Sequence, residues 1–207
     1  VWCVLFTESR RLGGVTIPVR RVAEGGGSGI IDRTSPWNGR VFSYSNLLES
    51  SIQSIKNVRT MSKTLILIHA VFGTSHRQST LNPENKDDLH RMMGYYLTQL
   101  DTQLLCINSM PDHVHILMSI KGSISLSDVI GKLKAYTSQW MKRSGWFPLF
   151  NGWCDGYFAC SVSPQNSEQV AGYIFNQEIH HNTRSYRDEM SSLYLKAGLQ
   201  WHEKELD

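Results

Sequence analysis

Two strand-forming runs joined by a Pro-Asp turn constrain this chain more than any other feature of its sequence. The run "QLLCINSM" (103–110) and the run "HVHILMSI" (113–120) are short and largely apolar, with β-branched residues in both. Pro111 and Asp112 stand between them, and both residue types favour turns. The pattern predicts an antiparallel hairpin, so the fold must contain a sheet built around it.

The second run of this hairpin carries two histidines on one face. Side chains alternate along a strand, so His113 and His115 point to one side while Val114 and Asp112 point to the other. Their backbone positions are then about 6–7 Å apart, which lets both imidazoles reach one metal ion. A His-x-His pair alone is weak evidence, because such a pair is more often structural or solvent-exposed. We assign Asp112 to the turn rather than to a metal shell.

The remaining periodicity predicts three helices and two further strands. Strands are expected at 64–72 and 156–163, and helices at about 84–100, from Ser125 or Ser127 to about Arg143, and after 164. With the hairpin, the order is β-α-β-β-α-β-α. This order predicts an α+β fold with a ferredoxin-like split βαβ antiparallel sheet and an added C-terminal helix.

The composition changes at Met61. Residues 1–60 contain "EGGGSG" and scattered hydrophobic residues without a sustained period, and all eight histidines follow them. We therefore expect a disordered or over-extended segment at 1–60 and one domain at 61–207, with Met61 as a plausible start. The alternative is a flexible arm that contacts DNA through its arginines, Arg10, Arg11, Arg20 and Arg21.

Charge, cysteine usage and hydropathy bound the class of protein. The net charge of +3 arises in residues 1–60, which hold 8 of the 21 basic and 4 of the 18 acidic residues. Residues 61–207 carry a net charge of about −1, so their electrostatic field is too weak to attract a polyanion such as DNA over a distance. No apolar run approaches the roughly 18 residues of a membrane span, and the four cysteines form no C-x-x-C pair. We expect a cytoplasmic protein without membrane contact.

A second group of candidate site residues lies downstream, in "GYIFNQEIHH". Tyr173, Gln177 and His180 share one stripe of the expected third helix. If that helix packs on the sheet face that carries the histidines, Gln177 can supply a third metal ligand and Tyr173 can project over the ion. The alternatives are a half-buried packing tyrosine and a solvated glutamine.

Together these motifs resemble the single-tyrosine HUH transposases, which include insertion-sequence transposases that move as single-stranded DNA and REP-associated tyrosine transposases. The resemblance rests on "HVH" after "MPD", "GYFACSVS", "GYIFNQEIHH" and "SYRDEMSSLYLKAGLQW", in that order, and it covers about Ser62 to the C-terminus. It leaves residues 1–60 unaccounted for.

The resemblance implies a specific site and reaction. It implies that His113, His115 and Gln177 bind a divalent metal, Mg²⁺ or Mn²⁺, and that Tyr173 is the nucleophile that cleaves and rejoins single-stranded DNA. The covalent intermediate would be a 5′-phosphotyrosine, and the substrate hairpin-forming element ends. Family members include monomers and homodimers, and both assemblies stay open here.

Candidate DNA contacts lie on two helices. Lys132, Lys134, Lys142 and Arg143 follow the second expected helix with aromatic residues interleaved, a combination that suits a single strand, although a solvated face is the alternative. His180 and His181 could assist Tyr173 or contact phosphate, or pack at the helix end.

Other functions fit the same elements. A non-catalytic single-stranded nucleic-acid-binding domain on a ferredoxin-like sheet would carry aromatic residues where this chain carries His-Val-His. A metal hydrolase without a covalent intermediate could use the two histidines. An HUH replication-initiator endonuclease commonly has a longer chain and often an extra tyrosine.

Overall fold

A four-stranded antiparallel sheet forms the centre of the protein. The computed structural model describes residues 8–12, 15–19, 63–181 and 185–202. The sheet order is β4-β5-β3-β6, with β3 at Ile66–Gly73, β4 at Gln103–Met110, β5 at His113–Ile120 and β6 at Phe158–Val162. Every neighbouring pair is antiparallel. The predicted α+β, ferredoxin-like order is confirmed, and β5 with its two histidines is an inner strand.

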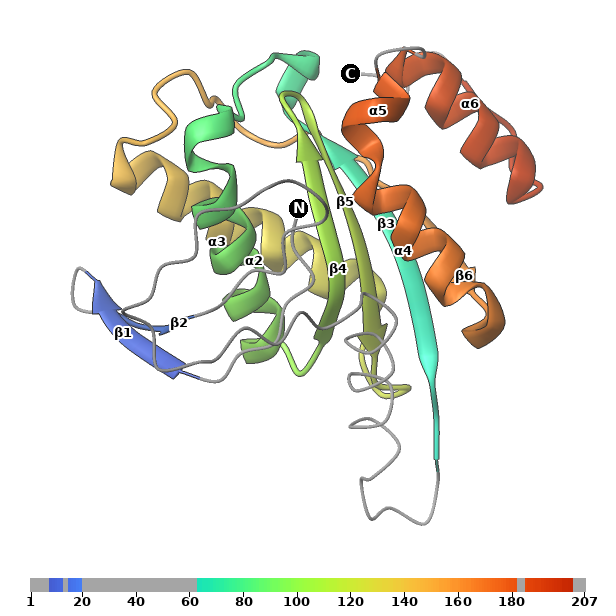
Figure 1. Ribbon diagram of the computed structural model, residues 1–207, viewed down its shortest axis with the longest axis horizontal. Helices are drawn as coiled ribbons and strands as arrows, with labels where there is room; N and C mark the ends of the chain where they lie inside the picture. The colour runs from blue at the N-terminus through green and yellow to red at the C-terminus, as the bar shows by residue number, and fades with distance from the viewer. Residues whose placement is uncertain (1–7, 13–14, 20–62, 182–184, 203–207) are drawn as a thin grey trace, which may run out of the picture.

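Helices cover both faces of this sheet (Figure 1). Helices α2 (Lys86–Gln99) and α3 (Leu126–Ser144) lie on one face, and α4 (Ser167–Phe175), α5 (Gln177–His181) and α6 (Tyr186–Lys196) lie on the other. Short 3-10 turns occur at Ser75–Arg77, Pro83–Asn85 and Pro164–Asn166. Among the described residues, no helix is long and apolar enough to cross a membrane.

The alternation of side chains along β5 divides its residues between two environments. Val114, Ile116 and Met118 are buried in the main hydrophobic core with α2 and α3. Leu117 belongs to a second cluster that includes Ala171 and Ile174 of α4. Since His113 and His115 share the face of Leu117, they point toward the C-terminal helices. The main hydrophobic core therefore packs against the face of β5 opposite the two histidines.

The C-terminal region differs from the expectation of one third helix. That helix ends at Phe175, and α5 begins at Gln177. Asn176 between them has φ −90° and ψ 18°, and its side chain donates to the Gly172 carbonyl at 3.0 Å. The Gly172 carbonyl also accepts the Asn176 backbone N–H at 3.1 Å, so the side chain shares the acceptor of the last helical bond, and the non-helical ψ of Asn176 ends α4. Tyr173 and Gln177 thus lie on successive helices rather than on one.

One helix and one two-stranded hairpin were not predicted. Helix α6 begins after Ser185, whose hydroxyl accepts the Asp188 backbone N–H at 3.2 Å as an N-cap. Within the segment predicted to be disordered or over-extended, β1 (Glu8–Leu12) pairs with β2 (Val15–Val19). The rest of residues 1–60 lies outside the described residues, and the division of the chain at Met61 stays a prediction.

Candidate active site

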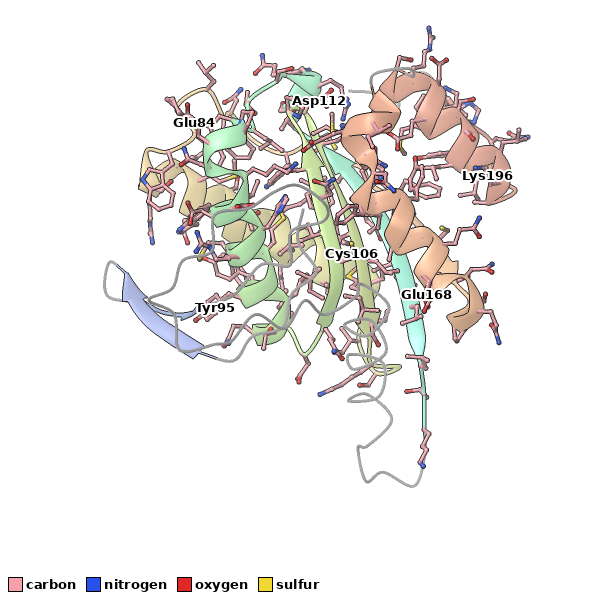
Figure 2. All side chains as sticks on the ribbon, in the orientation of Figure 1. Glu84, Tyr95, Cys106, Asp112, Glu168 and Lys196 are labelled. Carbon is pink, nitrogen blue, oxygen red and sulfur yellow. The ribbon has the colours of Figure 1, made fainter. Side chains whose placement is uncertain are left out.

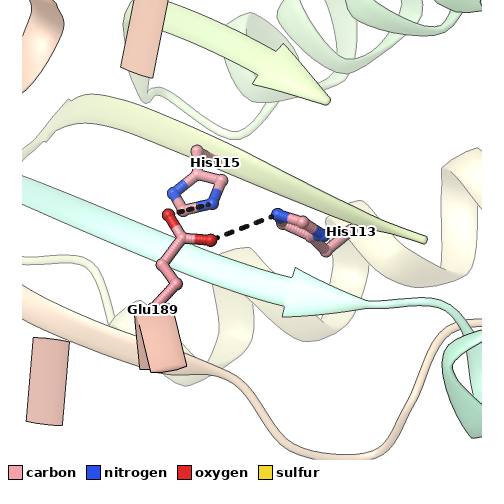
Figure 3. Close-up of side chains that lie close together, drawn as sticks. All are labelled: His113, His115 and Glu189. Atoms are coloured by element: carbon pink, nitrogen blue, oxygen red, sulfur yellow. Dashed lines mark ion pairs between the residues drawn. The ribbon is translucent and has the colours of Figure 1, made fainter. Parts of the chain in front are cut away.

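A carboxylate from α6 faces both histidines of β5 (Figure 3). The Nε2 atom of His113 lies 3.6 Å from Glu189 Oε2, and Nε2 of His115 lies 3.4 Å from Glu189 Oε1. One ligand atom from each residue lies within 4.8 Å of the others. Both imidazoles are fully buried and Glu189 is 5% exposed. Two imidazole nitrogens and a carboxylate at this separation form a cluster that could bind a metal ion.

Tyr173 and Gln177 converge on the same carboxylate. The Tyr173 hydroxyl donates a hydrogen bond to Glu189 Oε1, and Gln177 Nε2 donates to that oxygen at 2.8 Å. The Tyr173 ring lies edge-on to His115, with centroids 6.0 Å apart. The structure therefore brings together the three predicted metal ligands and the predicted nucleophile, which are His113, His115, Gln177 and Tyr173. They surround Glu189, which the sequence analysis did not predict as a site residue.

The helix of Tyr173 is fixed to the sheet by Asn108 of β4. Asn108 pairs with His115 in the strand register and is fully buried. Its amide donates to the carbonyls of Ile174 at 2.9 Å and Phe175 at 3.3 Å, which are among the last carbonyls of α4. These carbonyls have no partner further along their own helix, so Asn108 satisfies them. The strand that pairs with the histidine strand thereby also positions the helix that carries Tyr173.

Asp112 holds the outer nitrogen of His113, which corrects its assignment to the turn alone. Its Oδ1 lies 2.7 Å from His113 Nδ1, and Arg77 donates to Oδ2 at 2.5 Å and to the Asp112 carbonyl at 3.0 Å. Figure 2 shows Asp112 at the end of the sheet where the hairpin turns. A carboxylate behind a ligating imidazole fixes its orientation and raises its basicity. Asp112 can orient His113 because the turn leads directly into β5.

Tyr186 and Gly73 lie beside the ion pair between Arg77 and Asp112. Tyr186 of α6 lies against the His113 ring, with centroids 4.8 Å apart, and the Arg77 guanidinium stacks on the Tyr186 ring. Burial raises the pKa of Tyr186 to about 12 against the opposing effect of Arg77, so its hydroxyl stays protonated. Gly73, opposite His113, leaves the space that Arg77 fills, because a Cβ there would lie 2.5 Å from Arg77 Nη1.

The predicted DNA contacts on α3 do not join this site. Lys132, Lys142 and Arg143 are exposed on a helix that covers the opposite face of the sheet. Lys134 is turned inward, and its Nζ donates to the carbonyls of Cys154, Asp155 and Gly156 at 2.6–3.1 Å. Burial lowers the pKa of Lys134, with Cys154 and Asp155 opposing. The side chains of His180 and His181 lie outside the described residues.

The chemistry of the donor set fits a divalent ion. The Gln177 side chain is fully buried, and its Oε1 has no hydrogen-bond partner within the described part of the chain. Leaving a buried amide oxygen without a donor costs about 1–3 kcal/mol, so such an atom needs a ligand. A metal ion beside two imidazoles and a carboxylate would satisfy it.

Glu189 was missed because helix α6 was missed. The signal for that helix was present, since Ser185 and Asp188 form an N-terminal capping pair and Met190, Leu193 and Tyr194 follow at helical spacing. What the pattern lacks is any indication of where the helix packs. Contacts of Met190, Leu193 and Tyr194 with Phe158 and its neighbours, together with Tyr186 against the His113 ring, place α6 so that Glu189 faces β5.

Comparison with known proteins agrees with the motifs. The chain is 26% identical over 116 residues to the ISDra2 transposase TnpA of Deinococcus radiodurans, an alignment that covers 53% of this chain and 81% of that protein. A crystal structure of a putative transposase from the same organism is 24% identical, with a TM-score of 0.47 over 58% of this chain and 97% of that one. A REP-associated tyrosine transposase bound to a REP hairpin is 13% identical, with a TM-score of 0.46 over 60% and 74%.

A sequence profile supplies the decisive comparison. The family described as "Transposase IS200 like" matches residues 62–177, which is more than half of the chain and spans both histidines, Tyr173 and Gln177. The match begins within two residues of the composition change at Met61. The chain belongs to the IS200-like transposase family.

Proposed function

We propose that this transposase cleaves and rejoins single-stranded DNA through a covalent 5′-phosphotyrosine at Tyr173. The observation that carries the proposal is the position of the Tyr173 hydroxyl, which shares Glu189 Oε1 with Gln177 next to two buried imidazoles. A phenol beside a candidate metal centre is a nucleophile placed for phosphoryl transfer. The replication-initiator and non-catalytic alternatives lose support because the family is one of transposases.

Each reaction step can be written for this chain's own groups. The Tyr173 oxygen attacks the scissile phosphorus, the bond from phosphorus to the 3′ oxygen breaks, and the freed 3′ oxygen takes up a proton from water and leaves as a 3′-OH. Glu189 Oε1, which accepts the hydrogen bond of the phenol, is the group placed to receive its proton. In the reverse direction a 3′-OH attacks the phosphotyrosine, Tyr173 regains its proton, and the strand is rejoined.

His113, His115 and an oxygen of Gln177 or Glu189 would hold a divalent ion, Mg²⁺ or Mn²⁺. When bound, the ion neutralises charge on the non-bridging oxygens of the phosphate. Imidazole ligands favour Mn²⁺ over Mg²⁺, so we expect tighter binding of Mn²⁺. The residues around the pair, Asp112 above all, keep the imidazoles oriented toward the centre.

Access to this site requires a movement of α6. His113, His115 and Gln177 are fully buried beneath Tyr186 and Glu189. A DNA phosphate cannot reach their ligand atoms while α6 stays in this position. We therefore propose that binding of the DNA strand shifts α6 far enough to admit the scissile phosphate while Glu189 stays within hydrogen-bonding reach of Tyr173.

The DNA substrate is proposed to be single-stranded with a hairpin near the cleavage site. The test is a cleavage assay with Mg²⁺ or Mn²⁺ on a labelled hairpin strand, its fully duplexed form and a strand of scrambled sequence. Preferential cleavage of the hairpin strand, abolished in His113→Ala, supports the proposal. Equal cleavage of the duplex, or cleavage that survives His113→Ala, contradicts it.

A further inference from the structure

His69, a buried histidine on strand β3, lies beside the proposed metal ligand His115. It is 2% exposed, and its ring stacks on that of His115 with centroids 5.4 Å apart and an interplanar angle of 23°. Its Nε2 lies 3.2 Å from His115 Nδ1, a hydrogen-bonding distance. The His69 ring also forms T-shaped pairs with Phe158 and Tyr173, with centroids 6.3 Å and 6.2 Å apart. No motif in the sequence drew attention to this residue.

The two imidazoles of the His-x-His pair are arranged alike. Each turns Nε2 toward Glu189, at 3.6 Å for His113 and 3.4 Å for His115. Each turns Nδ1 toward a buried or half-buried partner, which is Asp112 for His113 and His69 for His115. The same ring nitrogen of both residues is therefore directed at the centre of the site.

The hydrogen bond at Nδ1 of His115 determines whether its Nε2 carries a hydrogen or a free lone pair. A neutral imidazole carries one ring hydrogen, and the nitrogen without it has the lone pair that binds a metal. If His115 donates its Nδ1 hydrogen to His69 Nε2, its own Nε2 presents a lone pair to the site. If the shared hydrogen instead belongs to His69, His115 carries a hydrogen on Nε2 and cannot bind.

We propose that His69 is a positioning residue that fixes the ring and the metal-binding tautomer of His115, as Asp112 does for His113. This inference rests on the proposed metal site, because it assigns a partner to one of its ligands. The two partners differ in chemistry, since Asp112 is a carboxylate in an ion pair with Arg77 and His69 is an imidazole packed among aromatic rings. The pair is thus held by two independent supports, one in the hairpin turn and one on the neighbouring strand β3.

A packing role for His69 would give a different result from a positioning role. His69→Phe keeps a ring of similar size but removes the acceptor, whereas His69→Gln keeps an acceptor and removes the ring. The matched control is His90→Phe, because His90 is also fully buried and its Nε2 lies 2.8 Å from Ser109 Oγ, on the side of the sheet covered by α2.

The test is Mn²⁺ binding by the full chain without DNA, measured by calorimetry and by electron paramagnetic resonance. We expect His69→Phe to weaken binding about ten- to a hundredfold, the usual effect of losing such a support, and His69→Gln to recover part of the loss. His90→Phe should bind as the parent does. Equal affinity of His69→Phe and the parent would overturn the role of His69 while leaving the metal site intact.

Two further measurements keep the outcomes distinct. If the parent fails to bind Mn²⁺, or if His113→Ala binds it as tightly as the parent does, the metal site itself is wrong, and the inference falls with it. If His69→Phe does not fold, the tautomer is read in the metal-free parent from ¹⁵N shifts of the ring nitrogens. The inference requires hydrogen on Nδ1 of His115, and hydrogen on Nε2 would overturn it.

Discussion

The hydroxyl of Tyr173 donates a hydrogen bond to the carboxylate of Glu189, sixteen residues later on a separate helix. The same carboxylate faces His113 and His115. One acidic side chain thus connects the proposed nucleophile with the proposed metal ligands. The position of α6 therefore bears directly on whether the site is assembled.

The substitution Glu189→Gln tests the proposed part of this carboxylate in cleavage. The amide oxygen could still accept a hydrogen bond from Tyr173 but could not take up its proton, so we expect cleavage to slow about 10²- to 10⁴-fold. Rates are measured at saturating Mn²⁺ so that weaker metal binding does not determine the result. The matched control is Glu178→Gln, because Glu178 is exposed on α5 and its carboxylate forms an ion pair with Lys86, away from the histidines. Equal rates for the two variants would remove Glu189 from the reaction.

The contacts of α4 predict that Tyr173 acts on the histidine pair of its own chain. Asn108 fixes the end of α4 to the strand beside β5. Mixing His113→Ala with Tyr173→Phe should therefore restore no cleavage, since neither chain holds a complete site. Substantial recovery in the mixture would show that the tyrosine helix is exchanged between two copies in a homodimer.

The environment of His69 predicts an acid-sensitive fold. Burial, with a further contribution from His115 and an opposing one from Glu189, lowers the pKa of His69 from 6.5 to about 3. Between these values the unfolded chain binds a proton that the folded chain does not. This difference leaves the free energy of unfolding unchanged above pH 6.5. As the pH falls from 6.5 toward 3, it lowers the free energy of unfolding by at most about 1.4 kcal/mol per pH unit.

This acid sensitivity is measured by urea unfolding in EDTA at about pH 7 and about pH 5, on either side of the ordinary histidine pKa. The free energy of unfolding of the parent should fall more between these values than that of His69→Phe, which has no group to titrate there. Parallel changes in the two proteins would contradict the shift.

Substitution of Lys134 should destabilise the protein, whereas substitution of Lys132 on the same helix should not. Lys134→Met removes a cation that satisfies three carbonyls of the segment before β6, and we expect a loss of about 1–3 kcal/mol of stability. Lys132→Met alters an exposed side chain and should change stability by less than about 0.5 kcal/mol. Thermal unfolding measures both.

If single-stranded DNA binding weakens only in Lys132→Met, the predicted contact on α3 is supported at that position, and no change would argue against it.

The sequence was informative where local patterns determine structure. Alternation along 113–120, the turn at Pro111 and the apolar period of α3 predicted the hairpin, the shared face of the two histidines and a helix that starts at Ser125 or Ser127; the structure contains all three, with Ser125 as the N-cap. These features depend on residues close in the chain, so periodicity and capping rules reach them.

The parts that were missed depend on contacts between distant residues. Glu189 meets β5 because α6 packs on Phe158 and its neighbours and on the His113 ring, and His69 meets His115 only through strand pairing between β3 and β5. The helix break falls at Asn176, whose backbone leaves the helical conformation while its side chain and its N–H both bond to the Gly172 carbonyl. No spacing along the sequence encodes these contacts.

The central claim is most directly tested by identifying the atom to which DNA becomes attached. A hairpin-bearing single strand, labelled on the 3′ side of the cleavage site, is incubated with the protein and Mn²⁺, and the denatured adduct is digested and sequenced by mass spectrometry. The account predicts a 5′-phosphate of the labelled fragment on Tyr173, and no adduct in Tyr173→Phe. An adduct on another residue, or cleavage by water that persists in Tyr173→Phe, would contradict it.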